Sequence, residues 1–262
     1  MNIKFIGTGS GKTSLNRYHS SFLITSSDDK LLIDCGDGTA RALLSCNVHF
    51  NSINSIIISH LHPDHYSGLP SLLTQMKLEK RREKLALYIH KSEKDFIEQF
   101  IQHSYLFLDR LSFELEIIPF SEEEKISITE QFSFVSKCNT HLEKYRGNKS
   151  SEKLSFVSLC FLIKDQENSL IFTGDVGSKE DLFLFDEKVD WFITEITHSS
   201  PTGLMRLLNE DRAKIIIVTH LDPVSEEMIQ QFQNNSSISE INSKVIIATD
   251  GFELYHYQSG CL

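Results

Sequence analysis

Four residues of the types that bind metal ions lie in one short stretch of the chain. The chain reads His-Leu-His-Pro-Asp-His over residues 60–65, directly after an isoleucine-rich run. Imidazole nitrogens and carboxylate oxygens are the ligands that zinc and related divalent metals take in proteins. A single histidine would most simply be a surface residue, but this density of ligands at the end of a strand is hard to explain by packing. The motif therefore predicts a metal site.

The spacing inside this motif separates its ligands into two pairs. His60 and His62 are two residues apart, so their side chains project to one side of an extended chain. Pro63 disfavours helix at His62 and keeps that segment extended. Asp64 and His65 then lie on the turn into the helix that follows. One pair can serve one ion and the other a second ion, and two ions about 3.5–4 Å apart can share a bridging oxygen.

Three further ligand-type residues follow predicted strands elsewhere in the chain: His141, Asp175 and His220. Active-site residues gather on loops at strand ends in layered α/β folds. Taken alone, His141 could be an ordinary loop residue and Asp175 a helix N-cap. Taken together with the first motif, all three are predicted to be metal ligands.

The elements that must position these side chains alternate between short β-rich runs and helical stretches. The predicted strands cover residues 3–6, 20–25, 30–34, 55–59, 85–90, 114–119, 131–136, 156–164, 169–173, 190–194, 214–219, 244–248 and 252–257. The predicted helices cover residues 38–45, 69–80, 92–106, 179–185, 202–208 and 225–232. Residues 26–29 and 249–251 carry the composition of hairpin turns. This pattern predicts a layered α/β sandwich of two sheets.

Composition and charge exclude several classes of protein. The chain has 262 residues, 40% apolar and 24% charged, which is an ordinary globular mixture. No apolar stretch approaches the length of a membrane span, so no membrane partner is expected. The net charge of −10 does not attract polyanions by its overall field. Five cysteines without a close pair, and no signal-peptide core, predict a reducing cytoplasmic location.

These residues resemble the metallo-β-lactamase superfamily. The matching elements are Asp34 in Leu-Ile-Asp-Cys-Gly, the motif of residues 60–65, His141, Asp175 and His220, in the family's order. The segments Phe-Ile-Gly-Thr-Gly-Ser at 5–10 and Ala-Thr-Asp-Gly at 248–251 are similar to the ribonuclease Z and phosphodiesterase branch. The resemblance implies one domain over residues 1–262, built as a four-layer αββα sandwich of two mixed β-sheets.

The resemblance also implies the ligand roles around two divalent metal ions. The first ion would be bound by His60, His62 and His141. The second would be bound by Asp64, His65 and His220. Asp175 would bridge the two ions, and Asp34 would hold the site together. This donor set favours zinc, and manganese or iron would also fit it.

A second resemblance to the ribonuclease Z branch lies in residues 195–200, which read Glu-Ile-Thr-His-Ser-Ser. The histidine of this segment, His198, precedes His220 by 22 residues. In that branch a histidine of such a loop assists catalysis. His198 is thus expected to donate a proton to the leaving group, paired with Glu195, while Asp64 orients the attacking water. Here the glutamate and histidine motifs are nearly fused, and the usual intervening segment is missing.

Only 34 residues separate His141 from Asp175, which leaves little room for the arm that grips tRNA in common bacterial ribonuclease Z. We therefore favour hydrolysis of a small phosphodiester, such as a cyclic nucleotide, by a metal-activated hydroxide. The alternatives are a tRNA 3′-processing endonuclease of the ribonuclease Z type, and a thioester or sulfur-metabolism enzyme of the same fold. The expected partners are a phosphodiester-containing small molecule or RNA, and a second copy in a homodimer.

Two weaker signals complete the sequence. The glycine-rich residues 7–13 do not predict an ATP site, because the first glycine of a P-loop would fall on Ile6 and no helix follows. These glycines are better explained by a tight turn near the metal site. The basic segment 77–84 is either a solvated helix end or a contact to nucleic acid or a second copy. The basic segment 142–153 is either a solvated loop or a contact to substrate phosphate.

Overall fold

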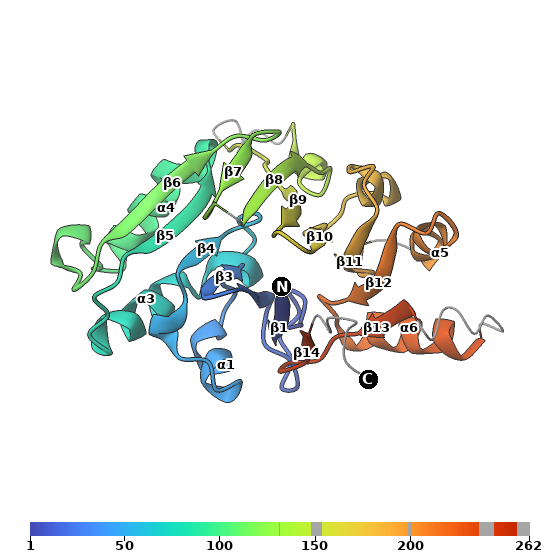
Figure 1. Cartoon of the computed structure of the whole chain (residues 1–262), viewed down its shortest axis with the longest axis horizontal. Helices are drawn as coiled ribbons and strands as arrows, with labels where there is room; N and C mark the ends of the chain where they lie inside the picture. Colours follow the sequence, from blue (N-terminus) through green and yellow to red (C-terminus); the bar gives the residue numbers. More distant parts are fainter. Residues whose placement is uncertain (131, 148–153, 199–200, 236–243, 256–262) are drawn as a thin grey trace.

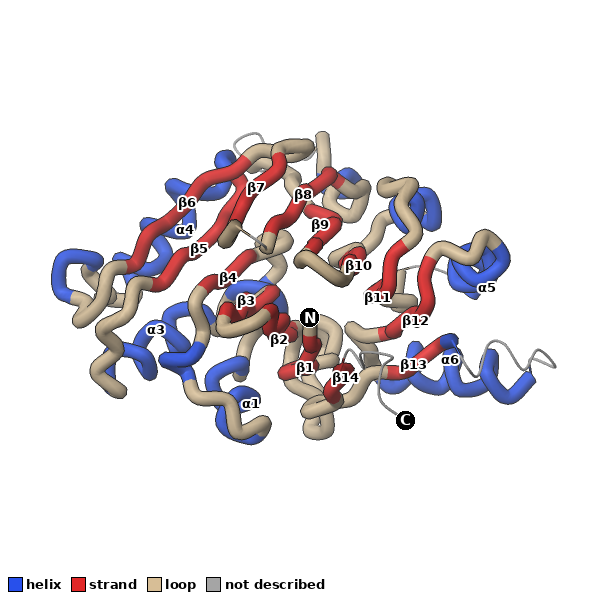
Figure 2. The backbone as a smooth tube through the Cα atoms, viewed as in Figure 1, coloured by secondary structure: helices blue, strands red, loops and turns tan. Residues whose placement is uncertain are grey.

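Two β-sheets face each other in the computed structural model, with helices on their outer faces (Figure 1, Figure 2). The structure describes residues 1–130, 132–147, 154–198, 201–235 and 244–255. In Figure 2, α1, α3 and α4 flank one group of strands, and α5 and α6 flank the other. The predicted four-layer sandwich of two mixed sheets is confirmed.

The first sheet contains seven strands in the order β14-β1-β2-β3-β4-β5-β6. The strands are β1 (Asn2–Gly7), β2 (Ser21–Ser26), β3 (Asp29–Ile33), β4 (Ser55–Ile57), β5 (Leu85–His90), β6 (Leu115–Phe120) and β14 (Glu253–Tyr255). Neighbours from β14 to β3 are antiparallel, and those from β3 to β6 are parallel.

The second sheet also contains seven strands, in the order β13-β12-β11-β10-β9-β8-β7. The strands are β7 (Lys125–Ser127), β8 (Ser133–Cys138), β9 (Leu159–Lys164), β10 (Ser169–Phe172), β11 (Val189–Thr194), β12 (Ala213–Val218) and β13 (Val245–Ile247). The strands from β13 to β10 are parallel, and those from β10 to β7 are antiparallel. Consequently β8, β10 and β12 all run in one direction and end at the same edge.

Helices connect and cover these strands. The α-helices are α1 (Thr39–Ser45), α2 (Pro63–Tyr66), α3 (Leu69–Leu78), α4 (Lys94–His103), α5 (Pro201–Asn209) and α6 (Pro223–Asn235). The 3-10 helices are η1 (Phe50–Ser52), η2 (Lys91–Glu93), η3 (Leu108–Arg110), η4 (Glu143–Tyr145) and η6 (Lys179–Phe183). No helix within these described residues is long and apolar enough to cross a membrane.

Alternating apolar side chains of the strands fill three buried layers. In β3, Leu32 faces the layer under α1 and α3, while Leu31 and Ile33 face the layer between the two sheets. A third layer lies under α5 and α6. Burial of one such aliphatic side chain contributes about 1.5–3 kcal/mol, so these layers hold the strand ends in fixed positions.

Three of the differences between the structure and the sequence-based prediction concern a turn, an edge strand and a short helix. The turn at 249–251 is not a hairpin, because it joins β13 of the second sheet to β14 of the first. The three-residue edge strand β7 was not predicted, since so short a run carries no clear periodicity. Asp64 and His65 lie in the separate short helix α2 rather than on a simple turn. The hairpin at 26–29 is confirmed, since β2 and β3 are antiparallel neighbours.

One basic residue of segment 77–84 is structural. Arg81 is only 2% exposed, and its guanidinium donates to the backbone carbonyl oxygens of Asn51, Glu83 and Lys84. It therefore anchors the loop between α3 and β5, and the view of the whole segment as a solvated face is wrong at this residue.

Candidate metal centre

The seven predicted ligands meet where the two sheets come together. The motif of residues 60–65 follows β4 of the first sheet, and His141, Asp175 and His220 follow β8, β10 and β12 of the second. An isolated bridge pairs His60 with Ser158, so the two sheets are joined at this point. The donor atoms form two clusters, each with all atoms within 4.8 Å of one another. These are His60, His62, His141 and Asp175, and Asp64, His65, Asp175 and His220.

The first cluster contains three imidazoles and one carboxylate oxygen. His62 Nδ1 lies 3.1 Å from His60 Nε2 and 3.0 Å from His141 Nε2. Asp175 Oδ2 lies 3.6 Å from His141 Nε2 and 3.9 Å from His60 Nε2. Four donor atoms from three separate segments therefore surround a single point.

The second cluster uses the other oxygen of Asp175. Oδ1 of this carboxylate lies 3.3 Å from both His65 Nε2 and His220 Nε2. Asp64 Oδ2 lies 3.1 Å from His220 Nε2 and 3.5 Å from His65 Nε2. The Asp175 carboxylate thus presents one oxygen to each cluster, which is the geometry that a bridging ligand requires.

These distances fit a divalent cation in each cluster. Four ligand atoms about 2.0–2.1 Å from a tetrahedral zinc ion lie about 3.3 Å from one another. The observed separations of neighbouring donors, from 3.0 to 3.9 Å, bracket that value. In addition, His65 Nε2 is buried and makes no hydrogen bond of acceptable geometry, although buried polar atoms normally find a partner. The clusters therefore have the composition and the spacing of a divalent-metal site.

Asp34 orients His65 from behind. Its Oδ2 lies 2.7 Å from His65 Nδ1 and accepts a hydrogen bond from Ser59 Oγ, while its Oδ1 accepts one from the Ser59 N–H. A carboxylate on one ring nitrogen fixes the ring and directs the other nitrogen to the metal position. This is the supporting position that the family resemblance implied for Asp34.

Burial and charge adjust the protonation of the imidazoles. Burial lowers the pKa of His141 to about 4 and lowers the pKa values of His60 and His62 in the same direction. These three rings are therefore neutral at pH 7, and neutral imidazole is the form that binds metal. Burial opposes protonation of His65 and His220 as well, but the carboxylates beside each ring together outweigh it and raise both pKa values. These carboxylates are Asp175 and Asp34 for His65, and Asp175 and Asp64 for His220.

Glu195 and His198 form a pair beside the two clusters. Glu195 is 1% exposed, and its Oε2 accepts a hydrogen bond of 2.8 Å from the backbone N–H of His198. Its Oε1 lies 3.2 Å from His198 Nδ1, and the His198 ring lies 4.8 Å from the His141 ring. The two residues therefore pair directly, although the segment that usually lies between their motifs is missing here. Ser199 and Ser200, the rest of this motif, lie outside the described residues.

One buried residue that positions the site was missed from the sequence. Asp181 Oδ2 accepts hydrogen bonds from Gly177 N (2.8 Å), Ser178 N (3.1 Å) and Thr140 Oγ1 (2.8 Å). It thereby ties the loop of His141 to the loop of Asp175. The Ser-x-x-Asp spacing at 178–181 signals a helix cap, but nothing in the sequence shows the contact with Thr140.

The glycine-rich residues 7–13 turn beside the second cluster. A Cβ atom on Gly11 would lie 3.3 Å from Asp64 Oδ2, so the backbone approaches this carboxylate closely. Behind the turn, Asp250 accepts hydrogen bonds from Thr8 N and Tyr18 N, and Arg17 donates to Thr8 Oγ1. Gly11 thus lies beside the second cluster, while Gly7 and Gly9 pack against the backbone of residues 17–19.

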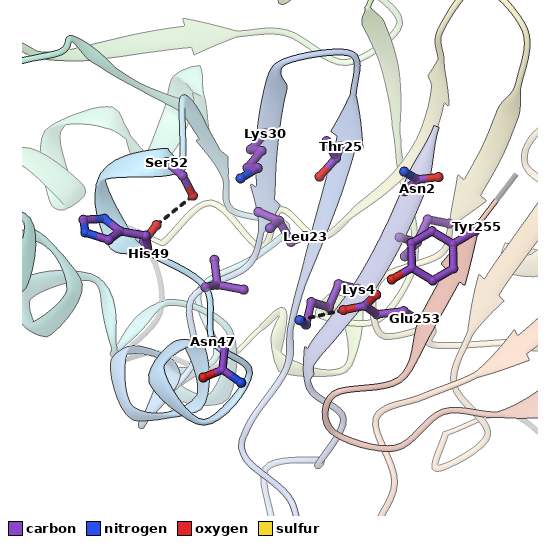
Figure 3. Close-up of a pocket in the computed structure, with 12 residues that line it drawn as sticks. Asn2, Lys4, Leu23, Thr25, Lys30, Asn47, His49, Ser52, Glu253 and Tyr255 are labelled. Carbon is purple, nitrogen blue, oxygen red and sulfur yellow. Dashed lines mark hydrogen bonds and ion pairs between the residues drawn. The ribbon is translucent and has the colours of Figure 1, made fainter.

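A separate cavity of about 340 Å³ lies beside α1, away from both clusters (Figure 3). Its lining includes Asn2, Lys4, Lys30 and His49, and Lys4 pairs with Glu253 at 2.6 Å. None of the predicted site residues lines this cavity.

Known proteins share this fold and sequence pattern. The ribonuclease Z of Saccharolobus solfataricus is 26% identical over 274 residues, which cover 88% of this chain and 92% of that protein. The ribonuclease Z of Clostridium perfringens is 27% identical over 315 residues, with 97% and 98% covered. The crystal structure of human tRNase Z, short form, aligns with a TM-score of 0.73 at 21% identity, covering 97% of this chain and 99% of its own.

The fold and the paired clusters together define a metal-dependent hydrolase of the metallo-β-lactamase superfamily, in its ribonuclease Z and phosphodiesterase-like branch. Within it, the family model described as anti-Pycsar protein Apyc1 matches residues 1–242, and the chain belongs to that family.

Proposed function

We propose that this protein hydrolyses the phosphodiester of a small nucleotide, with a cyclic nucleotide as the leading substrate. The reaction would take place at two divalent metal ions held by the two clusters, with Zn²⁺ as the expected ion and Mn²⁺ or Fe²⁺ compatible with the ligands. Residues 1–262 would form one domain around this site. The cytoplasmic location and the homodimer stay predictions.

Two bound ions would supply a hydroxide at neutral pH and neutralise charge on the phosphoryl oxygens. The first would be held by His60, His62 and His141, and the second by Asp64, His65 and His220. Asp175 would contact both through its two oxygens. Asp64, whose carboxylate also faces the second position, would orient the attacking water.

His198 would donate the proton that the leaving oxygen needs. Its Nδ1 faces Glu195, so Nε2 is the nitrogen left for proton transfer to the substrate. Glu195 is held by hydrogen bonds from Val176 N and His198 N, so it fixes the tautomer and orientation of the ring. Such positioned acids contribute about 10²–10⁴-fold to a rate.

One observation carries the proposal: a shared carboxylate lies between two donor clusters, with a glutamate-paired histidine directly beside them. Two-metal sites of this kind are suited to displacement at phosphorus, because one ion can serve the attacking oxygen and the other the leaving oxygen. The relatives named ribonuclease Z support hydrolysis of the same kind of bond, a phosphodiester.

The test is a substrate panel with metal-loaded protein. It contains cyclic mononucleotides, an aryl phosphodiester, short oligonucleotides and a pre-tRNA, and product is followed by chromatography. We expect turnover of a cyclic mononucleotide that stops on chelation and returns on addition of Zn²⁺. Turnover that is unchanged by chelation and by His62→Ala would contradict the proposal.

The second candidate is a tRNA 3′-processing endonuclease, favoured by the full-length similarity to ribonuclease Z of two organisms. Between His141 and Asp175 the described residues include η4, β9 and β10, and only residues 148–153 lie outside the described part of the chain. This interval therefore leaves little room for an arm that grips tRNA. Cleavage of the pre-tRNA at the 3′ end, without turnover of cyclic nucleotides, would establish this candidate instead. Bound iron with oxygen uptake would indicate the sulfur-metabolism alternative.

A further inference from the structure

The turn that follows His141 places a cation and an aromatic ring at the rim of the metal site. The Glu143 N–H donates to Thr140 O and the Tyr145 N–H donates to Leu142 O, so η4 is fixed to the loop of His141. Lys144 and Tyr145, the second and third residues of η4, are both exposed.

Tyr145 lies against a predicted metal ligand. Its ring centroid is 6.0 Å from that of His62, and the two rings are perpendicular, at 89°. The residue as a whole is 42% exposed. An aromatic face in this position can stack with a base, since every nucleobase offers a π-face.

Lys144 supplies positive charge beside the same cluster. Its Nζ lies 5.2 Å from the centre of the Tyr145 ring. Within the described residues Lys144 forms no ion pair with a carboxylate, whereas its neighbour Arg146 pairs with Glu143.

An ammonium at the rim of the site adds to the positive charge that the two bound ions would supply. The chain has a net charge of −10, and three of its carboxylates, those of Asp64, Asp175 and Glu195, lie within the site. The overall field therefore does not attract a phosphate, and charge close to the site must do so.

We propose that Lys144 and Tyr145 form the substrate-recognition element of the site, in which the ammonium binds a phosphate oxygen and the ring stacks on a nucleobase. The substrate class is then a nucleotide whose base and phosphodiester are engaged together, rather than an arbitrary phosphodiester. This inference rests on the proposed function, because it assigns the substrate of the same metal site.

The experiment compares two substrates with zinc-loaded protein: a nucleoside 3′,5′-cyclic phosphate and the ribose cyclic phosphate that lacks a base. We expect Tyr145→Ala to raise KM for the nucleotide about tenfold, as expected for loss of one stacked base. The rise for the base-free substrate should be at least five times smaller. Tyr145→Phe should retain the KM of the unchanged protein within about twofold.

Lys144→Gln should raise KM for both substrates about tenfold, because both carry the phosphate, and Lys144→Arg should restore most of the loss. Arg146→Gln is the matched control, since it removes a charge from the same turn that already pairs with Glu143. It should leave both KM values within about twofold. Zinc content and melting temperature are measured for each variant, so that loss of metal or fold is recognised.

The outcomes separate the two proposals. If the unchanged protein hydrolyses the nucleotide but Tyr145→Ala alters KM equally for both substrates, the recognition element is wrong and the proposed function stands. The same conclusion follows if Lys144→Gln behaves like Arg146→Gln. If the zinc-loaded, unchanged protein hydrolyses neither substrate, the proposed function fails and this inference fails with it.

Discussion

The two sheets deliver their metal-binding side chains in different ways. The first sheet provides four candidate ligands from one continuous stretch, residues 60–65, which runs from the end of β4 into α2. The second sheet provides three, one each after β8, β10 and β12. A local motif can be recognised from spacing alone, whereas dispersed ligands depend on topology that brings parallel strand ends to one edge.

The supports behind the ligands differ in the same manner. Asp34 acts within the first sheet and holds the ring of His65 directly. Asp181 acts within the second sheet and holds backbone and side-chain donors of two loops, without touching a ligand itself. One support fixes a side chain, and the other fixes the distance between two loops.

The largest effect is expected at the residue where the two regions meet. Asp175→Ala removes one donor from each cluster, so it should lower turnover at least about 1,000-fold and abolish tight binding of both ions. Metal content by mass spectrometry and the rate on a cyclic nucleotide measure this. The control is Asp186→Ala, whose side chain is fully exposed. Retention of both ions in Asp175→Ala would show that the carboxylate does not bridge.

The next effect concerns His198, contributed by the second sheet. His198→Ala should lower kcat about 100-fold on a diester with an alkoxide leaving group, because the proton donor is lost. On a diester that releases p-nitrophenolate the loss should be below about tenfold, since this leaving group needs no proton. Equal losses on the two substrates would exclude a role in protonation.

The two supports can be tested against each other. Asp34→Asn should weaken binding at the cluster of Asp64, His65 and His220, and Asp181→Asn at the cluster of His60, His62 and His141, each by about 10–100-fold. Calorimetric titration of metal-free protein resolves the two binding steps. If both variants weaken the same step, the division of labour between the sheets is wrong.

The smallest effect is the pH dependence of metal binding. Neighbouring carboxylates, Asp175 foremost, raise the pKa values of His65 and His220, so these rings keep their protons to a higher pH than a free imidazole when no metal is bound. Their stabilising charge interactions are present below the unfolded pKa and are lost as the pH rises through the folded pKa. Metal must displace these protons. The affinity for metal should therefore fall about tenfold for each unit by which the pH is lowered, for each proton released. Titration in buffers of different ionisation enthalpy measures the release, and a value of zero would contradict this view.

The sequence predicted the sandwich because its strands carry strong local patterns, such as the isoleucine runs of β4 and β12. It also indicated the motif of residues 60–65, since proline and histidine spacing act within one segment. It could not give the order of the strands within each sheet or the way in which the two sheets pack. The contact of Asp181 with Thr140, 41 residues apart, follows from the strand order of the second sheet, and the sheet change at residues 249–251 follows from the packing of the two sheets.

The most direct test of the account is a crystal structure of zinc-loaded protein with anomalous scattering at the zinc edge. We predict two peaks about 3.5–4 Å apart, one beside His62 and the other beside His220, with Asp175 between them. A single peak, or two peaks that do not flank Asp175, would contradict the claim that the two sheets share one binuclear site.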